Sequence, residues 1–254
     1  MSDLQCAALQ LYTVRDLTAK DFAGTVKKVA DIGYKYVELA GYGSAGNAKA
    51  ARKALDDAGL KACSGHYAID LLEKNVEQVI ADADALGIDT VVCPFLPEGR
   101  RKDAKGYEET AKVLQDAGSQ LHGHGLILCY HNHNFEFQNF GGKTGLDIIF
   151  ENTAPHLVGA EIDCYWVQFA GADPVEQITK LGDRVRLLHL KDMTKDDKHF
   201  APVGGGVMKY DQILATAKKQ AVRWGIVEQD QTYGTPPLDA IKMSLESLKK
   251  LGAV

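Results

Sequence analysis

The chain has 254 residues, of which 45% are hydrophobic and 25% charged, and its formal net charge is −5. These values are typical of a globular protein, and the scattered basic residues leave no positive surface for a nucleic-acid backbone. No apolar stretch is long enough to cross a bilayer, and the first residues lack a signal-peptide pattern, so we expect no membrane partner. The five cysteines form no C-x-x-C pair and lie in or beside apolar runs, which favours reduced thiols in a cytoplasmic protein.

Short apolar runs alternate along the chain with polar loops and amphipathic segments. Most of these runs are continuously apolar, which is typical of parallel strands that are covered on both faces. In chain order we expect eight strands, at residues 7–11, 36–40, 61–65, 90–93, 126–130, 158–163, 186–190 and 224–227.

The segments between the expected strands carry apolar residues at helical spacing. One stripe runs from Phe22 to Ile32, and a second, from Leu71 to Leu86, consists of Leu71, Leu72, Val76, Val79, Ile80, Ala83 and Leu86. Glycines at 33, 59, 87 and 182 predict helix ends, and Asp173-Pro174 predicts a helix start. With no linker in the sequence, we expect a single domain, residues 1–254, folded as an α/β (β/α)8 TIM barrel. A doubly wound open sheet is the alternative, but residues 10–15 lack the glycine-rich first turn that usually accompanies it.

Polar side chains capable of chemistry follow the expected strands, at the end of a barrel where active sites lie. They include Gln10, Glu38, His66, His131, His133, Glu136, Asp163, His189, Lys191 and Glu228. Any one of them is explained equally well by capping or hydrogen bonding. Four consecutive strand ends, however, carry His131 or Glu136, then Asp163, His189 and Glu228, and these ends converge on the barrel axis. Such a mixed set without a thiolate favours Mn²⁺, Mg²⁺, Co²⁺ or Zn²⁺ in an open catalytic site.

Three other polar residues are left outside the expected site. His122 and His124 precede the fifth strand and therefore belong to the opposite end of the barrel. Glu161 lies two residues before Asp163, and its position does not decide between the barrel bottom and the site.

The motifs LQLYTVRD, YVELAGY, SGHY, CYHNHNFEF, EIDCYW, LLHLKD and VEQD, in this order, resemble the sugar phosphate isomerase/epimerase family of xylose isomerase-like TIM barrels. The resemblance covers essentially the whole chain and is specific for the superfamily rather than for one reaction. It implies a divalent metal, most often Mn²⁺, held by Asp163, His189 and Glu228. The family's strand-five glutamate falls at or beside His131, so the fourth ligand is either His131 or Glu136.

The resemblance also implies an enzyme that acts on a keto-sugar or a related polyol. Glu228, His133 or Glu136 would remove the proton α to the carbonyl, and Lys191 and His66 would donate hydrogen bonds. Gln10, Glu38 and Trp166 would contact the substrate, although Trp166 is equally explained by packing its loop on the barrel.

Returning the proton to another face or carbon gives epimerisation or isomerisation, the reaction we favour. Expelling a β-oxygen gives the alternative, a hydratase or lyase that acts on 3-keto-sugars or 3-keto-glycosides, or an inosose dehydratase-like enzyme. An endonuclease IV-like DNA repair activity is disfavoured by the net charge of −5. A metal-free sugar-binding barrel would need no convergent ligands. The resemblance also leads us to expect a homo-oligomer.

Overall fold

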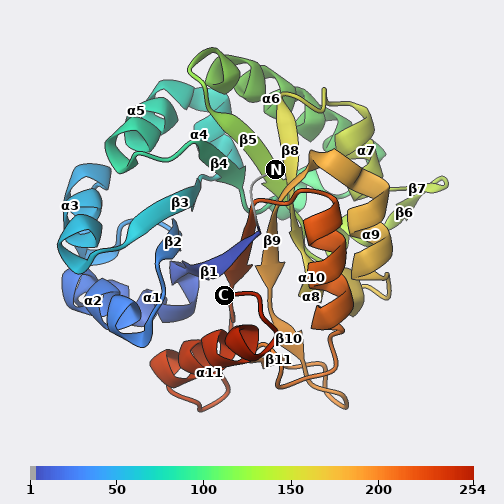
Figure 1. Ribbon diagram of the computed structural model, residues 1–254. Helices are drawn as coiled ribbons and strands as arrows, with labels where there is room; N and C mark the ends of the chain where they lie inside the picture. The colour runs from blue at the N-terminus through green and yellow to red at the C-terminus, as the bar shows by residue number, and fades with distance from the viewer. Residues whose placement is uncertain (1–3) are drawn as a thin grey trace.

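The computed structural model describes residues 4–254, in which eight parallel strands close into a barrel (Figure 1). They are β1 (Gln5–Gln10), β2 (Tyr36–Leu39), β3 (Lys61–His66), β4 (Thr90–Cys93), β5 (Ile127–His131), β8 (Val158–Asp163), β9 (Val185–Leu190) and β12 (Trp224–Val227). Around the barrel their order is β1-β12-β9-β8-β5-β4-β3-β2, so each strand pairs with its neighbours along the chain. The eight-stranded barrel and all eight expected strands are therefore confirmed, with ends displaced by no more than two residues.

The helices form the outer ring of the barrel (Figure 1). They are α1 (Arg15–Thr18), α2 (Phe22–Ile32), α3 (Ala48–Ala58), α4 (Ile69–Lys74), α5 (Val76–Leu86), α6 (Ala104–Gly123), α7 (Gly145–Glu151), α8 (Cys164–Phe169), α9 (Pro174–Leu181), α10 (Tyr210–Lys219) and α11 (Pro237–Lys250). Single 3₁₀ turns lie at η1 (Leu11–Val14), η2 (Gly43–Ala45), η3 (Glu98–Arg100), η4 (Phe135–Phe137) and η5 (Gly182–Arg184). None of the helices within residues 4–254 combines the length and apolar character needed to span a membrane.

Side-chain caps and glycines fix the ends of these helices. The Asp21 carboxylate accepts a hydrogen bond from the Gly24 N–H at 2.9 Å at the start of α2, and Gly33 ends that helix with a φ of 117°. Asp173 caps α9 ahead of Pro174, as the sequence predicts. The expected continuous helix from Leu71 to Leu86 is wrong, because it breaks at Asn75, whose φ of −155° and ψ of 60° are not helical.

The inside of the barrel changes from apolar to polar along the strands. Its apolar layer is a buried cluster that includes Ala8, Cys129, Leu187 and Ile226. Because side chains two residues apart share one face of a strand, the next inward-facing positions are Gln10, His131, His189 and Glu228. All four are buried, so the polar residues of the sequence motifs line the axis directly above an apolar floor.

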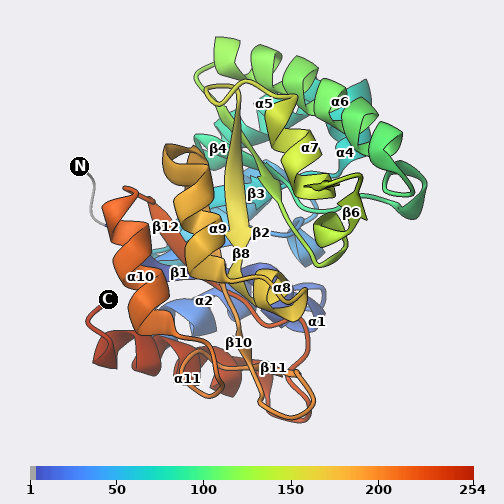
Figure 2. The same cartoon turned by 90° about the vertical axis from the view of Figure 1, so that its right-hand side faces the viewer.

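The segments that follow the strands cover the C-terminal end of the barrel. Figure 2 shows α8 directly beyond the end of β8, and Figure 1 shows the small hairpin of β10 (Asp192–Met193) and β11 (Phe200–Ala201) beyond the end of β9. A second two-stranded hairpin, β6 (Asn139–Phe140) with β7 (Lys143–Thr144), follows β5. These insertions are too short to be seen as strands in the sequence, and they form the surroundings of the site.

Candidate active site at the C-terminal end of the barrel

A pocket of about 480 Å³ opens at the C-terminal end of the barrel. His66, His131, Lys191 and Glu228 line it together with His133, and the rim carries Tyr12, Phe95 and Asp230. Tyr12 and Phe95 are 41% and 45% exposed, so the rim offers aromatic surface above a polar floor. This is the combination of a few convergent polar groups and apolar walls that is expected of a small-molecule site.

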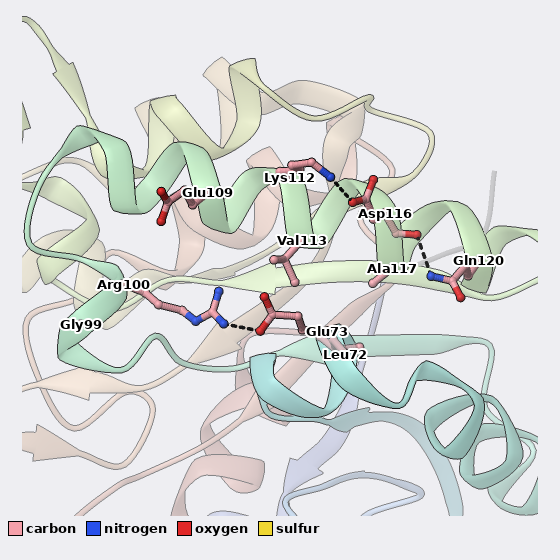
Figure 3. A pocket seen from close by; sticks show the side chains of 10 residues that line it. All are labelled: Leu72, Glu73, Gly99, Arg100, Glu109, Lys112, Val113, Asp116, Ala117 and Gln120. Carbon is pink, nitrogen blue, oxygen red and sulfur yellow. Dashed lines mark hydrogen bonds and ion pairs between the residues drawn. The ribbon is translucent and has the colours of Figure 1, made fainter.

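A larger hollow of about 620 Å³ lies on the outside of the barrel, against α4, η3 and α6 (Figure 3). Its charged side chains pair with one another, since Arg100 contacts Glu73 and Lys112 lies 2.6 Å from Asp116. It holds no histidine and none of the residues that the sequence singles out. We therefore assign the chemistry to the smaller pocket.

The floor of that pocket is a layer of charged groups around one ammonium, which we call the upper layer. The Lys191 nitrogen lies 2.8 Å from Asp163 Oδ2, 2.6 Å from Glu228 Oε2 and 2.7 Å from Asp230 Oδ1. Burial lowers the pKa of Lys191, but the three carboxylates outweigh this effect and raise its pKa well above the ordinary value. Burial raises the pKa of Asp163 to about 6 even beside this cation, whereas the cation and His189 keep the pKa of Glu228 well below its ordinary value.

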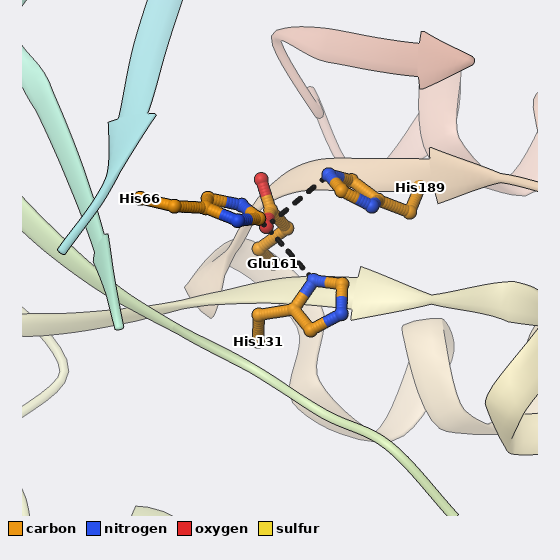
Figure 4. Close-up of side chains that lie close together, drawn as sticks. All are labelled: His66, His131, Glu161 and His189. Atoms are coloured by element: carbon orange, nitrogen blue, oxygen red, sulfur yellow. Dashed lines mark hydrogen bonds and ion pairs between the residues drawn. The ribbon is translucent and has the colours of Figure 1, made fainter. Parts of the chain in front are cut away.

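A second layer of imidazoles and carboxylates lies directly beneath, and we call it the lower layer. It consists of Glu38 on β2, His66 on β3, His131 on β5, Glu161 on β8 and His189 on β9. Figure 4 shows the three imidazoles arranged around Glu161, whose Oε2 lies 2.9 Å from His131 Nδ1, 3.1 Å from His66 Nε2 and 3.3 Å from His189 Nε2. Glu38 Oε1 lies 2.7 Å from His189 Nε2 and 3.0 Å from His66 Nε2.

Two imidazoles connect the layers through their opposite nitrogens. His189 Nδ1 lies 2.8 Å from Glu228 Oε2, and its other nitrogen faces Glu38. His131 Nδ1 contacts Glu161, while its Nε2 lies 3.6 Å from Asp163 Oδ2. Each imidazole is thus oriented by a carboxylate in both layers.

The structure brings most of the predicted site residues together, but not Glu136. Its side chain is fully buried and accepts hydrogen bonds from the Tyr130 hydroxyl and, at 2.8 Å, from the His133 N–H. Glu136 therefore holds the loop after β5 rather than reaching the pocket. Burial raises its pKa to about 7.

His133 lines the pocket itself, and its Nδ1 is buried without a hydrogen-bond partner. Burial lowers the pKa of His133 to about 3, so this imidazole is neutral at physiological pH. Trp166 packs behind it, with ring centroids 5.5 Å apart, and does not line the pocket. The rings that do form the rim are those of Tyr12 and Phe95.

Two residues of the site were missed from the sequence. Glu161 is two residues before Asp163 on β8, so the alternation of faces along that strand was the signal that places the two together. Asp230 lies two residues after Glu228 in the loop that follows β12, where no such pattern applies. The exclusion of His122 is consistent with the structure, since it lies in the last turn of α6.

The donor atoms fit a divalent cation. Two overlapping sets have ligand atoms within 4.8 Å of one another: Asp163, His189 and Glu228, and separately His66, His131, Glu161 and His189. Glu161 Oε1 is buried with no hydrogen-bond partner, as expected of an atom that has another kind of partner. A carboxylate and imidazole set of this kind suits Mn²⁺, Co²⁺ or Zn²⁺.

Comparisons with known proteins agree with this fold. The chain belongs to the xylose isomerase-like TIM barrel family, whose model matches residues 26–251. A sugar phosphate isomerase/epimerase structure from Parabacteroides distasonis is 25% identical with a TM-score of 0.82, and the match covers 98% of each chain. D-allulose 3-epimerase from Methylomonas sp. has the same fold, with a TM-score of 0.75, 15% identity and 99% of each chain covered.

Among curated proteins, inosose dehydratase 2 of Bacillus cereus is 25% identical over 54% of this chain and 49% of its own length. The chain thus spans about half the length of the curated relatives it matches. The named relatives are enzymes, and they include both dehydratases and epimerases.

Proposed function

We propose that the protein is a divalent-metal-dependent sugar isomerase or epimerase that acts on a keto-sugar or a related polyol. The observation that carries this proposal is the floor of the pocket, where one ammonium, the Glu228 carboxylate and several imidazoles face a cavity of about 480 Å³. Such a floor removes a proton α to a carbonyl and stabilises the negative charge that develops on the oxygen.

The chain's own residues divide this work. Glu228 is kept ionised by Lys191 and His189 and is available to take the α-proton. Lys191 lines the pocket, and its positive charge would stabilise the oxygen on which negative charge develops, while His66 at the pocket wall would contact a neighbouring hydroxyl. A divalent cation, when bound among the histidines and carboxylates, supplies Lewis-acid polarisation of the carbonyl. The family's ligand positions fall on Asp163, His189, Glu228 and His131, and a second group with the donor atoms of a metal site is formed by His66, His131, Glu161 and His189.

One observation favours a second candidate, β-elimination by a dehydratase or lyase. His133 presents a neutral imidazole to the pocket with an unpartnered nitrogen, and a group of this kind delivers a proton to a leaving oxygen. In that reaction Glu228 takes the α-proton, the bond from the β-carbon to oxygen breaks, and the oxygen departs as water or alcohol once protonated. The inosose dehydratase relatives agree with this alternative.

Turnover of a panel of keto-sugars, inososes and 3-keto-glycosides with Mn²⁺ tests both candidates. An isomerase or epimerase incorporates solvent deuterium at the α-carbon without elimination, whereas elimination produces an enone that absorbs in the near ultraviolet. Glu228→Gln should lower kcat by at least about 100-fold, in the range typical for loss of a general base. Glu246→Gln, an exposed change on α11, is the matched control and should leave kcat unchanged. Absence of turnover and of exchange on every substrate would refute the proposal.

A further inference from the structure

The lower layer has the composition of a ligand set rather than of a hydrogen-bonded network. Its five side chains come from five different strands and converge on the barrel axis, and four of them are at most 2% exposed. We propose that this layer, formed by Glu38, His66, His131, Glu161 and His189, is itself a divalent-cation site. It lies one layer deeper than Asp163 and Glu228.

The imidazole hydrogens available do not satisfy the contacts between imidazoles and carboxylates in this layer. Gln10 Nε2 and Ser64 Oγ donate to Glu38 at 2.7 and 2.6 Å, so the shortage falls on Glu161. Glu161 Oε2 faces three imidazole nitrogens, at 2.9, 3.1 and 3.3 Å, and Glu38 Oε1 faces two of the same nitrogens, at 2.7 and 3.0 Å. These five contacts involve only three nitrogens, each of which carries at most one hydrogen. A central cation requires no hydrogens, because it accepts a lone pair from every oxygen and nitrogen.

One buried atom of the layer is unpartnered. Glu161 is fully buried, and its Oε1 makes no hydrogen bond. A buried carboxylate oxygen without a hydrogen-bond donor destabilises the folded protein unless another group neutralises it. A cation bound to Glu161 provides that neutralisation.

The upper layer, by contrast, already holds its cation. The Lys191 ammonium lies within 2.8 Å of both Asp163 and Glu228, so an ion bound to these oxygens must displace it. Within residues 4–254, the ion pairs of Glu38 and Glu161 involve imidazoles only, and no lysine or arginine competes for them.

The upper carboxylates take a different part around a deep site. Glu228 contacts His189 through the nitrogen that faces away from the lower layer, and Asp163 approaches His131 in the same manner. Carboxylates in this position orient the imidazoles that bind a metal and increase their basicity. With three imidazoles and two carboxylates, the set suits Zn²⁺ or Co²⁺ better than Mg²⁺ or Ca²⁺.

The assignment of a catalytic role to a cation in the lower layer rests on the proposed function. Cation binding is measured without turnover, so failure of the site and failure of the proposed reaction are distinguishable.

The direct experiment locates the ion in crystals grown with Co²⁺ or Zn²⁺. Anomalous scattering should place one peak between Glu38 and Glu161. A peak only between Asp163 and Glu228 overturns the proposal. So does the absence of any bound ion in crystals with about 1 mM Co²⁺ or Zn²⁺, a concentration that fills a site whose Kd is well below about 1 mM.

Variants test the same point in solution by calorimetric titration of the chelator-stripped protein with Co²⁺. Glu161→Gln and His66→Phe each remove a ligand of the lower layer only, and each should weaken Co²⁺ binding by at least about 100-fold. Asp163→Asn, the matched isosteric change in the upper layer, should weaken it by about tenfold, the low end of the range for a group that orients a ligand, because Asp163 lies 3.6 Å from the His131 nitrogen. The reverse ranking overturns the proposal. Circular dichroism of each variant confirms folding, and if a variant fails to fold, the crystallographic peak decides.

Discussion

Glu136 couples the stability of the protein to pH in a direction opposite to that of most carboxylates. Burial raises the pKa of Glu136 from an ordinary value of 4.5 to about 7. Because the folded state binds this proton more tightly than the unfolded chain, the contribution of Glu136 to stability is fully present below about pH 4.5 and is lost as the pH rises through about 7. The gap between the two values corresponds to roughly 3 kcal/mol, at about 1.4 kcal/mol per pH unit.

Glu136→Gln removes this titration while preserving the local contacts. The amide oxygen accepts the His133 N–H, and the amide nitrogen donates to the Tyr130 hydroxyl oxygen, which also accepts hydrogen bonds. We therefore expect the free energy of unfolding of the variant, relative to the native protein, to increase by roughly 3 kcal/mol between about pH 4 and pH 8. Urea unfolding followed by circular dichroism at one-unit pH intervals measures this difference, in which groups that titrate identically in both proteins cancel.

The control for this experiment is Glu151→Gln, an exposed change at the end of α7. Its unfolding free energy should follow that of the native protein within about 0.5 kcal/mol at every pH. If the unfolding free energies of the native protein and of Glu136→Gln change in parallel with pH, then Glu136 has an ordinary pKa, and the reasoning is refuted. A relative gain of stability by the native protein at high pH would refute it as well.

Three further changes have defined outcomes. Lys191→Met leaves Asp163, Glu228 and Asp230 without their buried countercharge. The free energy of unfolding at pH 7, measured in urea, should fall by about 3–5 kcal/mol. A loss below about 1 kcal/mol would show that the three carboxylates do not depend on this ammonium. Arg184→Lys loses the planar fork that donates to the carbonyl groups of Phe150 and Thr153, and a loss of about 3 kcal/mol in the same assay is expected. Gly145→Ala directs a methyl group to within 2.4 Å of the Tyr107 ring, so helices α6 and α7 must move apart. The free energy of unfolding should fall by about 1–3 kcal/mol, and the melting temperature should fall with it. An unchanged melting temperature would show that the ring moves aside without cost.

The strands were predictable because a parallel barrel imposes a simple pattern on its sequence. Thr90–Cys93 is buried along its whole length and forms a short run without charged residues between polar loops. Val158–Asp163 is also buried throughout, and its two charged residues, Glu161 and Asp163, lie in its C-terminal half. The break between α4 and α5 was not predictable from the same pattern. The apolar stripe continues on both sides of Asn75, so periodicity alone does not show that the backbone leaves the helix there.

The site was predictable in position but not in depth. Strand ends placed His131, Asp163, His189 and Glu228 around one axis, but their order along that axis depends on strand tilt and register, which the sequence does not display. Glu161 was therefore not separated from residues of the barrel bottom. The position of Glu136 away from the pocket has another cause: the turn at η4 directs its side chain inward to Tyr130, and no sequence motif distinguishes this from a turn toward the pocket.

The 2.9 Å contact between His131 on β5 and Glu161 on β8 restricts which residue types can occupy these two positions as the sequence evolves. A glutamate at position 131 would set two carboxylates side by side in a buried space, so the exchange His131→Glu is tolerated only together with a neutral or basic residue at 161. Replacement of His131 by a glutamate therefore requires a paired exchange at position 161. Across related sequences, positions 131 and 161 should accordingly change together rather than singly.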